Sequence, residues 1–263
     1  DAVINLAAVH FDFGHTDDEY WDTNENGSQV LLSAMAAAGI KKYVFTSSIA
    51  VYGDRLDEAN EESEPTPTSV YGASKLAAEK VVEQWAAEDS SREIVIIRPC
   101  VVYGERNITN MLNLIRQINS GYFVLFGSGK NVKATAYVGN LVHVISDQVE
   151  SLNPGIKLYN YADKPDMTVE DVVRIIRTAL GKKPKPLQFP LWLGIVAAIP
   201  FEIVTRITGK NLPVSIARVK KLSQPTMVAA KKIRDAGFQQ PIPSDEGLTR
   251  MVKYFLETKS RDS

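Results

Sequence analysis

The alternation of apolar runs with helical patterns along the first hundred residues restricts the fold more than any other feature of the sequence. Apolar runs of strand length occupy 2–8, 41–48 and 93–98, and helical patterns separate them over 17–38 and 71–89. This order of strands and helices predicts right-handed crossovers and a parallel sheet. We therefore expect an α/β fold with a Rossmann-like parallel sheet and helices on both faces.

Shorter and more mixed elements follow Gly104. Helices are expected over 108–119, 139–151 and 168–181, and extended segments over 123–126, 132–138 and 157–161. The segment 157–161 is expected to rejoin the main sheet. A hairpin turn is expected at Gly127-Ser128-Gly129, because no helix opens after these glycines.

Composition excludes several kinds of partner. Thirty basic residues stand against thirty-one acidic ones, with a net charge of −1, so there is no electrostatic reason to expect nucleic acid as a partner. The three histidines, His10, His15 and His143, are scattered and offer no metal-ligand cluster. The single cysteine, Cys100, excludes an internal disulfide and suits a reducing compartment.

The most apolar segment runs from Leu187 to Ile207. Its uninterrupted apolar run is too short to span a bilayer and has prolines at both ends. A core or lid helix is therefore favoured over membrane contact.

Tyr71 and Lys75 lie four residues apart at the start of the pattern expected to be a helix over 71–89. Positions i and i+4 share one face of a helix, so the phenol and the ammonium can share one site. A lysine beside a tyrosine favours the phenolate and lowers the tyrosine pKa, which predicts a base that is usable near neutral pH. Such pairs also arise on solvated helix faces, so the spacing alone does not decide between the two interpretations.

Three segments in this order carry a family resemblance: 43–53 (YVFTSSIAVYG), 69–75 (SVYGASK) and 97–104 (IRPCVVYG). Together they resemble the extended short-chain dehydrogenase/reductase family, and in particular its nucleotide-sugar epimerase/dehydratase branch. The resemblance covers nearly the whole chain, densely up to Gly104 and more loosely beyond it.

The resemblance implies a catalytic set. Tyr71 is expected to be the acid/base, Lys75 to hold the cofactor ribose, and Ser48 to hydrogen-bond the reacting oxygen; a lone serine at this position could otherwise cap the end of a strand. The implied cofactor is NAD, with NADP not excluded. Cofactor contacts are expected from Tyr71, Lys75, Ala7, Ala8, Asn24, Thr46, Ser47, Pro99, Cys100 and Val102.

The resemblance also implies a substrate side. Substrate contacts are expected from Ser48, Ile49, Asn107, Lys133 and Arg218. Lys133 and Arg218 fall at phosphate-binding positions, although both could equally be solvated basic residues, and a lysine cannot form the bidentate contact that arginine makes. Ile49-Ala50 stands where dehydratases of the family carry an acidic pair, which argues against sugar dehydration.

The resemblance divides the chain into two regions. The dinucleotide-binding Rossmann domain is predicted over 1–120 with 138–165 returning to it, and the substrate-binding region over 121–137 and 166–263. A Gly-rich phosphate loop is not found in the sequence, and the apolar strand at 2–8 matches the fourth strand of the family's sheet. We therefore expect a fragment that lacks the first strands and, by itself, binds neither NAD nor NADP tightly.

The favoured function is an NAD(P)-dependent epimerase of a nucleotide sugar, working by transient removal and return of hydride in a cytoplasmic homodimer. One alternative is an NAD(P)-dependent reductase or dehydrogenase of an apolar alcohol or ketone, similar to hydroxysteroid or dihydroflavonol reductases. A second alternative is a non-catalytic, nucleotide-sensing relative, against which the intact Ser48, Tyr71 and Lys75 set argues.

Overall fold

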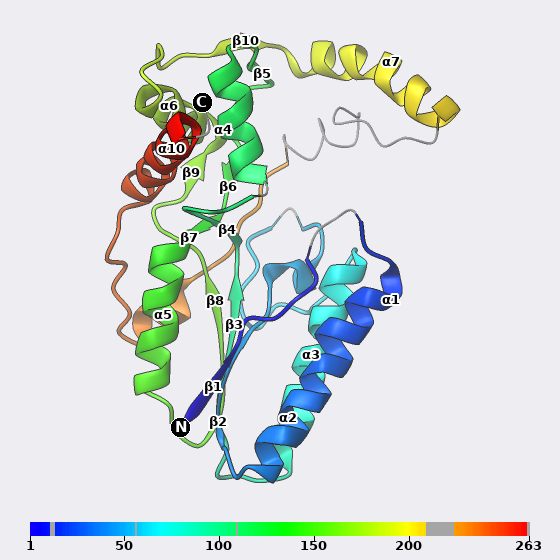
Figure 1. Cartoon of the computed structure of the whole chain (residues 1–263), viewed down its shortest axis with the longest axis vertical. Coiled ribbons are helices and arrows are strands. Elements are labelled where there is room, and N and C mark those ends of the chain that lie inside the picture. The colour runs from blue at the N-terminus through cyan, green and yellow to red at the C-terminus, as the bar shows by residue number, and fades with distance from the viewer. Residues whose placement is uncertain (11–13, 56, 109, 209–223, 262–263) are drawn as a thin grey trace. The chain divides into compact units, whose positions relative to one another are not determined.

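The computed structural model describes residues 1–10, 14–55, 57–108, 110–208 and 224–261 (Figure 1). Contacts between residues divide the chain into two units. The first unit comprises 1–102, 139–163 and 228–241, and the second comprises 103–138, 164–227 and 242–263.

Four parallel strands form the sheet of the first unit, in the order β1-β2-β3-β8. They are β1 (Ala2–Asn5), β2 (Lys42–Thr46), β3 (Glu93–Pro99) and β8 (Gly155–Tyr161). Val44 of β2 pairs with Ile4 on one side and Val95 on the other. The predicted parallel sheet is confirmed, and the strand expected at 157–161 joins it beside β3.

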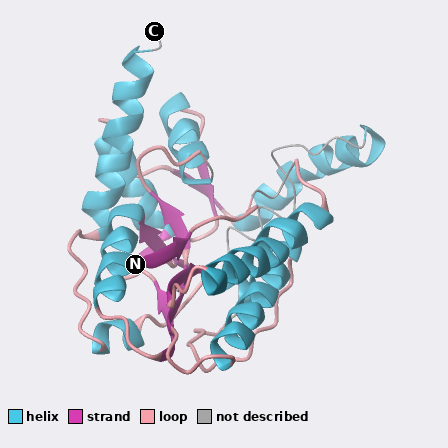
Figure 2. Cartoon of the chain, turned by 60° about the horizontal axis from the view of Figure 1, so that its bottom comes forward, coloured by secondary structure: helices cyan, strands magenta, loops and turns pink. Residues whose placement is uncertain are grey.

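Helices cover both faces of this sheet. Leu32 of α2 (Gly27–Ala37) and Val82 of α3 (Val70–Ala87) pack against Phe45 in one core cluster. Figure 1 shows α5 (Val138–Glu150) on the other side of the strands, and Figure 2 shows the strands in magenta between the helices. Because Val44 and its neighbour Phe45 point to opposite faces and are both fully buried, each face of the sheet is covered, as predicted. A short helix, α9 (Lys231–Asp235), contacts β8.

The helix expected over 17–38 contains a local irregularity. It consists of α1 (Asp17–Tyr20), a π-helical turn, η1 (Trp21–Asn26), and α2. A π-helical turn inserts an extra residue into a helix and is frequent at functional sites. Asn24 lies inside this turn and is 1% exposed, so the irregularity falls on a residue that the sequence assigned to the site.

The second unit is built from short strand pairs and helices. Its elements are α4 (Asn110–Ser120), β5 (Val124–Phe126), β6 (Val132–Lys133), β7 (Thr135–Tyr137), β9 (Met167–Thr168), α6 (Val169–Ala179), β10 (Leu187–Phe189), α7 (Leu191–Thr208) and α10 (Ser244–Arg261). β4 (Val101–Tyr103) leads into this unit and pairs with β7. The core of the unit includes Ile115 of α4, Val173 of α6 and Val252 of α10. Thr168 caps α6 in a capping box with Asp171, which confirms the predicted start of that helix.

The hairpin predicted at 127–129 is wrong. β5 pairs in parallel with β10, and β6 pairs antiparallel with β9, so the strands on either side of the turn do not pair with each other. Gly127 and Gly129 do turn the chain, with φ of 90° and 66°, but the Gly127 N–H donates to Phe189 O at 2.9 Å. The long-range partner strand therefore determines the pairing here.

The apolar segment 187–207 forms β10 and most of α7. A wholly buried core helix, one of the two expected forms, is wrong, because Trp192 is 62% exposed and Val196 is 52% exposed. Among the described residues, no helix is both long enough and apolar enough to cross a membrane.

Candidate active site

Ser48 lies just beyond the carboxyl end of β2, at the edge of the sheet where α/β folds bind ligands. It caps a short 3₁₀ helix, η2 (Ile49–Tyr52), and the Ala50 N–H donates to Ser48 Oγ at 3.1 Å. This N–H occupies one lone pair of the hydroxyl, and the Ser48 proton can still be donated toward the site.

The first turns of α3 carry Tyr71 and Lys75. Ser69 caps this helix by accepting a hydrogen bond from the Gly72 N–H at 3.1 Å. A Cβ on Gly72 would lie only 2.3 Å from the backbone oxygen of Ala50. Glycine at this position therefore lets α3 approach η2 closely, and this brings Tyr71 to Ser48.

The protonation state of Tyr71 differs from the expectation. Burial raises the pKa of Tyr71 above its usual value, and a hydrogen bond with Ser48 acts in the opposite direction without cancelling it. The lowered pKa predicted from the spacing of Tyr71 and Lys75 is therefore wrong for this structure, because desolvation disfavours the phenolate. Burial therefore favours the phenol of Tyr71 over the phenolate.

Lys75 is buried deeply, with 1% of its surface exposed. Its Nζ lies 4.2 Å from the centroid of the Phe45 ring. Burial lowers the pKa of Lys75 to about 8, and the Glu79 carboxylate one turn along α3 opposes this shift. The Lys75 ammonium is therefore in equilibrium with the neutral amine at a pH close to physiological.

A buried polar network lies behind Lys75, and the sequence motifs did not reveal it. Arg98 Nε and Nη2 donate to the two oxygens of Glu79 at 2.8 and 2.5 Å, and both side chains are at most 4% exposed. Arg98 Nη1 donates to Tyr52 Oη at 2.7 Å, and the Tyr52 hydroxyl donates to Asn160 Oδ1 at 2.8 Å. The signal available in the sequence was Glu79 at position i+4 from Lys75.

Asn24 links the exit of β1 to α3. Its Nδ2 donates to Ser74 Oγ at 2.9 Å and to the Val9 oxygen at 3.1 Å, and the Val9 N–H donates to Asn24 Oδ1 at 3.0 Å. Ser74 Oγ in turn donates to the backbone oxygen of Tyr71 at 2.9 Å. Asn24 therefore fixes backbone on both sides of the site.

Three buried polar atoms at this edge of the sheet have no hydrogen-bond partner among the described residues: Thr46 Oγ1, Ser47 Oγ and Lys75 Nζ. Buried polar groups are normally hydrogen-bonded, so each of these atoms is available to hydrogen-bond a bound group such as the ribose of a dinucleotide. Of the other predicted cofactor residues, Pro99 and Cys100 are buried at the end of β3, Ala8 and Val102 are half-buried, and Ala7 is exposed.

The predicted substrate residues are not brought together by these observations. Ile49 is half-buried at the start of η2. Asn107 lines a groove in the second unit together with Arg106 and Arg116, and Lys133 is half-buried on β6. Arg218 lies outside the described residues.

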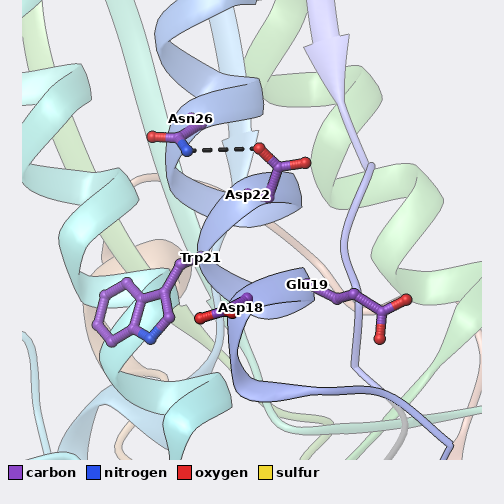
Figure 3. Close-up of a pocket in the computed structure, with 5 residues that line it drawn as sticks. All are labelled: Asp18, Glu19, Trp21, Asp22 and Asn26. Atoms are coloured by element: carbon purple, nitrogen blue, oxygen red, sulfur yellow. Dashed lines mark hydrogen bonds between the residues drawn. The ribbon is translucent and has the colours of Figure 1, made fainter.

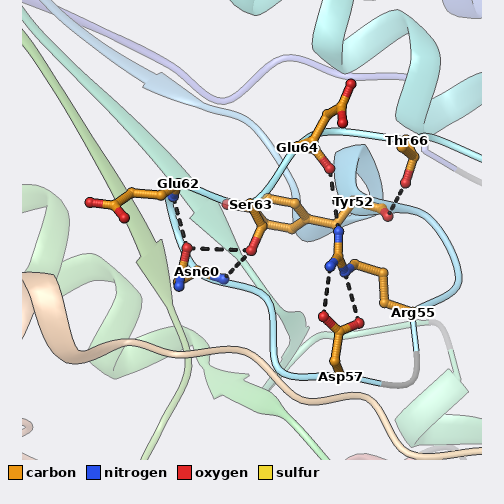
Figure 4. Close-up of polar contacts among 8 residues, drawn as sticks. All are labelled: Tyr52, Arg55, Asp57, Asn60, Glu62, Ser63, Glu64 and Thr66. Carbon is orange, nitrogen blue, oxygen red and sulfur yellow. Dashed lines mark hydrogen bonds and ion pairs between the residues drawn. The ribbon is translucent and has the colours of Figure 1, made fainter.

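The loop that leads to Tyr71 is held by its own polar contacts (Figure 4). Arg55 donates two hydrogen bonds to the Asp57 carboxylate, at 3.1 and 2.6 Å, and one to the backbone oxygen of Glu64 at 3.4 Å. Thr66 Oγ1 donates to the backbone oxygen of Tyr52 at 3.0 Å, which ties the end of the loop to η2. These contacts fix the entry of α3.

An acidic hollow on α1 and η1 is a separate feature (Figure 3). Asp18, Glu19, Trp21, Asp22 and Asn26 line it, and Asn26 Nδ2 donates to Asp22 Oδ1 at 3.4 Å. It contains none of the predicted site residues. Within the described ranges, no three histidine, cysteine or acidic side chains are grouped as metal ligands.

Gly72→Ala is expected to lower kcat by on the order of 100-fold, because its Cβ would push α3 away from the Ala50 backbone and separate Tyr71 from Ser48. Gly27→Ala is the matched control. A Cβ there meets only the Asp22 oxygen at 3.6 Å, so this helical substitution should leave kcat unchanged and raise the free energy of unfolding by roughly 0.5–1 kcal/mol. Steady-state kinetics and thermal unfolding of both variants test this, and equal kcat values would contradict it.

Known proteins are similar to this chain in sequence and in fold. The sequence profile of the NAD dependent epimerase/dehydratase family matches residues 1–160. The chain is 39% identical to the N-acetyl-alpha-D-glucosaminyl-diphospho-ditrans,octacis-undecaprenol 4-epimerase of Escherichia coli O157:H7, over 100% of this chain and 80% of that protein. It is 29% identical to the UDP-glucose 4-epimerase of Vibrio cholerae, over 92% of this chain and 71% of that protein.

A solved structure agrees in fold. The UDP-glucuronic acid 4-epimerase of Bacillus cereus in complex with NAD superposes with a TM-score of 0.76 at 20% identity, covering 98% of this chain and 75% of that one. At this identity the likeness supports the Rossmann-like fold alone. The sequence matches carry the family assignment, and the resemblance to extended short-chain dehydrogenases/reductases is confirmed: the chain belongs to the NAD-dependent epimerase/dehydratase family.

Proposed function

We propose that this protein is an NAD-dependent 4-epimerase of a sugar carried on a diphosphate. The observation that carries the proposal is the arrangement of Ser48, Tyr71 and the unpartnered Lys75 ammonium at one edge of the sheet. The named relatives with 39% and 29% identity are both 4-epimerases, which supports the position of the reaction on the sugar. Ile49 and Ala50 directly follow Ser48, where the dehydratases carry an acidic pair, and this supports epimerisation over dehydration.

The proton transfers of this reaction are assigned to residues of the site. In this step Tyr71 acts as the phenolate, which the positive nicotinamide ring of bound NAD would favour against the effect of burial. The phenolate takes the proton of the sugar hydroxyl as the carbon is oxidised to a ketone, and returns it when the ketone is reduced from its other face. Bound NAD would supply the hydride acceptor and donor, so the reaction has no net redox change. Ser48 donates its hydrogen bond to the reacting oxygen or to the phenolate, while the Ala50 N–H holds the Ser48 oxygen in place.

Two carriers of the sugar are candidates. A nucleotide sugar is the carrier expected from the sequence and supported by the UDP-glucose 4-epimerase relative. A polyprenyl diphosphate is supported by the relative with 39% identity, whose name specifies an undecaprenol carrier. Protein from the complete gene should be assayed with a UDP-hexose, with an undecaprenyl-diphosphate hexosamine and with an apolar alcohol. Oxidation of the alcohol without any sugar epimerisation would favour the reductase alternative instead.

Binding of NAD should weaken as the pH rises above 8. Lys75 is protonated below its pKa of about 8, and only the ammonium provides three donors and a charge for ribose hydroxyls and phosphate. If NAD favours the protonated form, its Kd should rise by up to roughly tenfold per pH unit above pH 8. Calorimetry at pH 7 to 9 measures this. Lys75→Met should bind NAD weakly at every pH, and a pH dependence that survives in this variant would assign the titration to another group.

The same proposal includes a homodimer in the cytoplasm. The single cysteine supports a reducing compartment, and the dimer follows from the family resemblance. Light scattering of the purified protein tests the dimer, and a monomer at micromolar concentration would contradict it.

A further inference from the structure

Helix α7 packs on its neighbours through its smallest side chains. A Cβ on Gly194 would lie 2.7 Å from Phe126 Cγ, so the helix contacts β5 at close range. Ala198, four residues further along, is fully buried. Gly194 and Ala198 therefore mark the packed face of α7.

The large apolar side chains of α7 lie on the opposite face. Trp192, Val196 and Ile199 are 62%, 52% and 43% exposed. Their spacing of four and three residues places them in one row, and at roughly 100° per residue this row lies about opposite to Gly194 and Ala198. A helix of a soluble domain normally buries its large apolar residues, so this row has the reverse arrangement.

The strand that precedes α7 also exposes apolar side chains. Leu187 is 68% exposed and Phe189 is 43% exposed, and alternate residues of a strand share one face. Gln188 between them turns the other way, and its Nε2 donates to the Gly127 oxygen at 2.8 Å. The apolar surface is defined by five exposed residues within one short segment: Leu187, Phe189, Trp192, Val196 and Ile199.

Basic residues border the apolar surface. Lys182, Lys183 and Lys185 precede it directly, and both Lys183 and Lys185 are exposed. No aspartate or glutamate occurs between Gly181 and Phe201, although the chain as a whole has a net charge of −1. The segment therefore combines local positive charge with exposed apolar side chains, including a tryptophan.

We propose that the apolar surface and its lysines dock on an anionic lipid membrane. Lysines beside exposed Trp, Phe and Leu side chains are typical of elements that lie in the headgroup region without spanning the bilayer. A second copy of the chain is a poorer occupant, because it presents the same surface, which has no acidic side chain between Gly181 and Phe201 to pair with the lysines. The proposal stands on exposure and charge, independently of the proposed function. A polyprenyl-diphosphate substrate, the second candidate above, would be held in the same membrane.

The test is co-sedimentation of the protein from its complete gene with vesicles of phosphatidylcholine, with and without phosphatidylglycerol. Binding is expected with phosphatidylglycerol and should weaken with added salt. Trp192→Glu should reduce this binding at least tenfold, and Lys183→Glu or Lys185→Glu by about fivefold or more each. Val142→Glu, at a 59% exposed position on α5, is the matched control and should bind like the unaltered protein.

Fluorescence locates the contact. Quenching by brominated lipid should fall strongly in Trp192→Phe while vesicle binding remains, because Trp85 is 6% exposed and Trp21 is half-buried on η1, outside the apolar surface. The proposal is overturned if the protein does not sediment with either kind of vesicle, or if Trp192→Glu and Val142→Glu bind equally. It is also overturned if Trp192→Glu converts a dimer to a monomer in light scattering and no vesicle binding is seen. Turnover of a soluble UDP-hexose should be the same in all these variants, so failure of this proposal can be distinguished from failure of the proposed function.

Discussion

Tyr71→Phe is expected to lower kcat by roughly 10²–10⁴, the usual contribution of a positioned acid/base. The substitution removes one oxygen from a half-buried side chain and leaves α3 and its Ser69 cap in place. Neither Ser48 nor Lys75 can replace the phenol without moving, because Ser48 Oγ is held by the Ala50 N–H and Lys75 Nζ lies over the Phe45 ring. The loss should therefore appear in kcat, with KM for the sugar changed much less.

Tyr43→Phe provides the control for this experiment. Tyr43 is another tyrosine of the first unit, and it is fully buried. Its hydroxyl accepts a hydrogen bond from Asn5 Nδ2 at 2.9 Å, and burial raises its pKa to about 12. Its substitution should cost about 1 kcal/mol of stability and leave kcat within a few-fold. If Tyr71→Phe retained activity to the same extent as Tyr43→Phe, Tyr71 would not be the acid/base.

Local sequence patterns predicted the elements that carry the site. The apolar spacing after Tyr71 lies within one helix, so the expected range of 71–89 differs from α3 by only one or two residues at each end. The strand leading to Ser48 and the capping box at Thr168 are equally local. Each of these depends on hydrogen bonds or side-chain periodicity within a few residues, which a single sequence contains.

Features that depend on distant partners could not be predicted in this way. β5 pairs with β10 more than sixty residues away, and the turn after β5 gave no sign of that partner. The apolar pattern of 187–207 correctly indicated a helix, but a pattern does not show whether other elements will cover its large or its small side chains. The pKa of Tyr71 illustrates the same point, since the spacing to Lys75 was visible and the amount of surrounding protein was not.

Glu79→Gln is expected to lower the free energy of unfolding by roughly 3–5 kcal/mol, because it leaves a buried charge without its partner. Glu79 and Arg98 are 2% and 4% exposed, and each oxygen of Glu79 accepts a hydrogen bond from the guanidinium. Lys75, one turn away, would also lose the carboxylate that opposes the effect of burial on its pKa, so that pKa should fall below about 8. For a chain of this size, the midpoint of thermal unfolding should drop by roughly 6–20 °C.

The double variant Glu79→Met/Arg98→Leu separates the charge from the packing. It removes both ions and keeps apolar volume at both positions, so it should be more stable than either Glu79→Met or Arg98→Leu alone. Urea unfolding of the four proteins gives the coupling energy, and strict additivity would show that the pair is not energetically linked. The double variant should still bind NAD less tightly at pH 8, since without Glu79 a larger share of Lys75 is neutral. The ion pair would then act on the site through the charge of Lys75, in addition to holding α3 against β3.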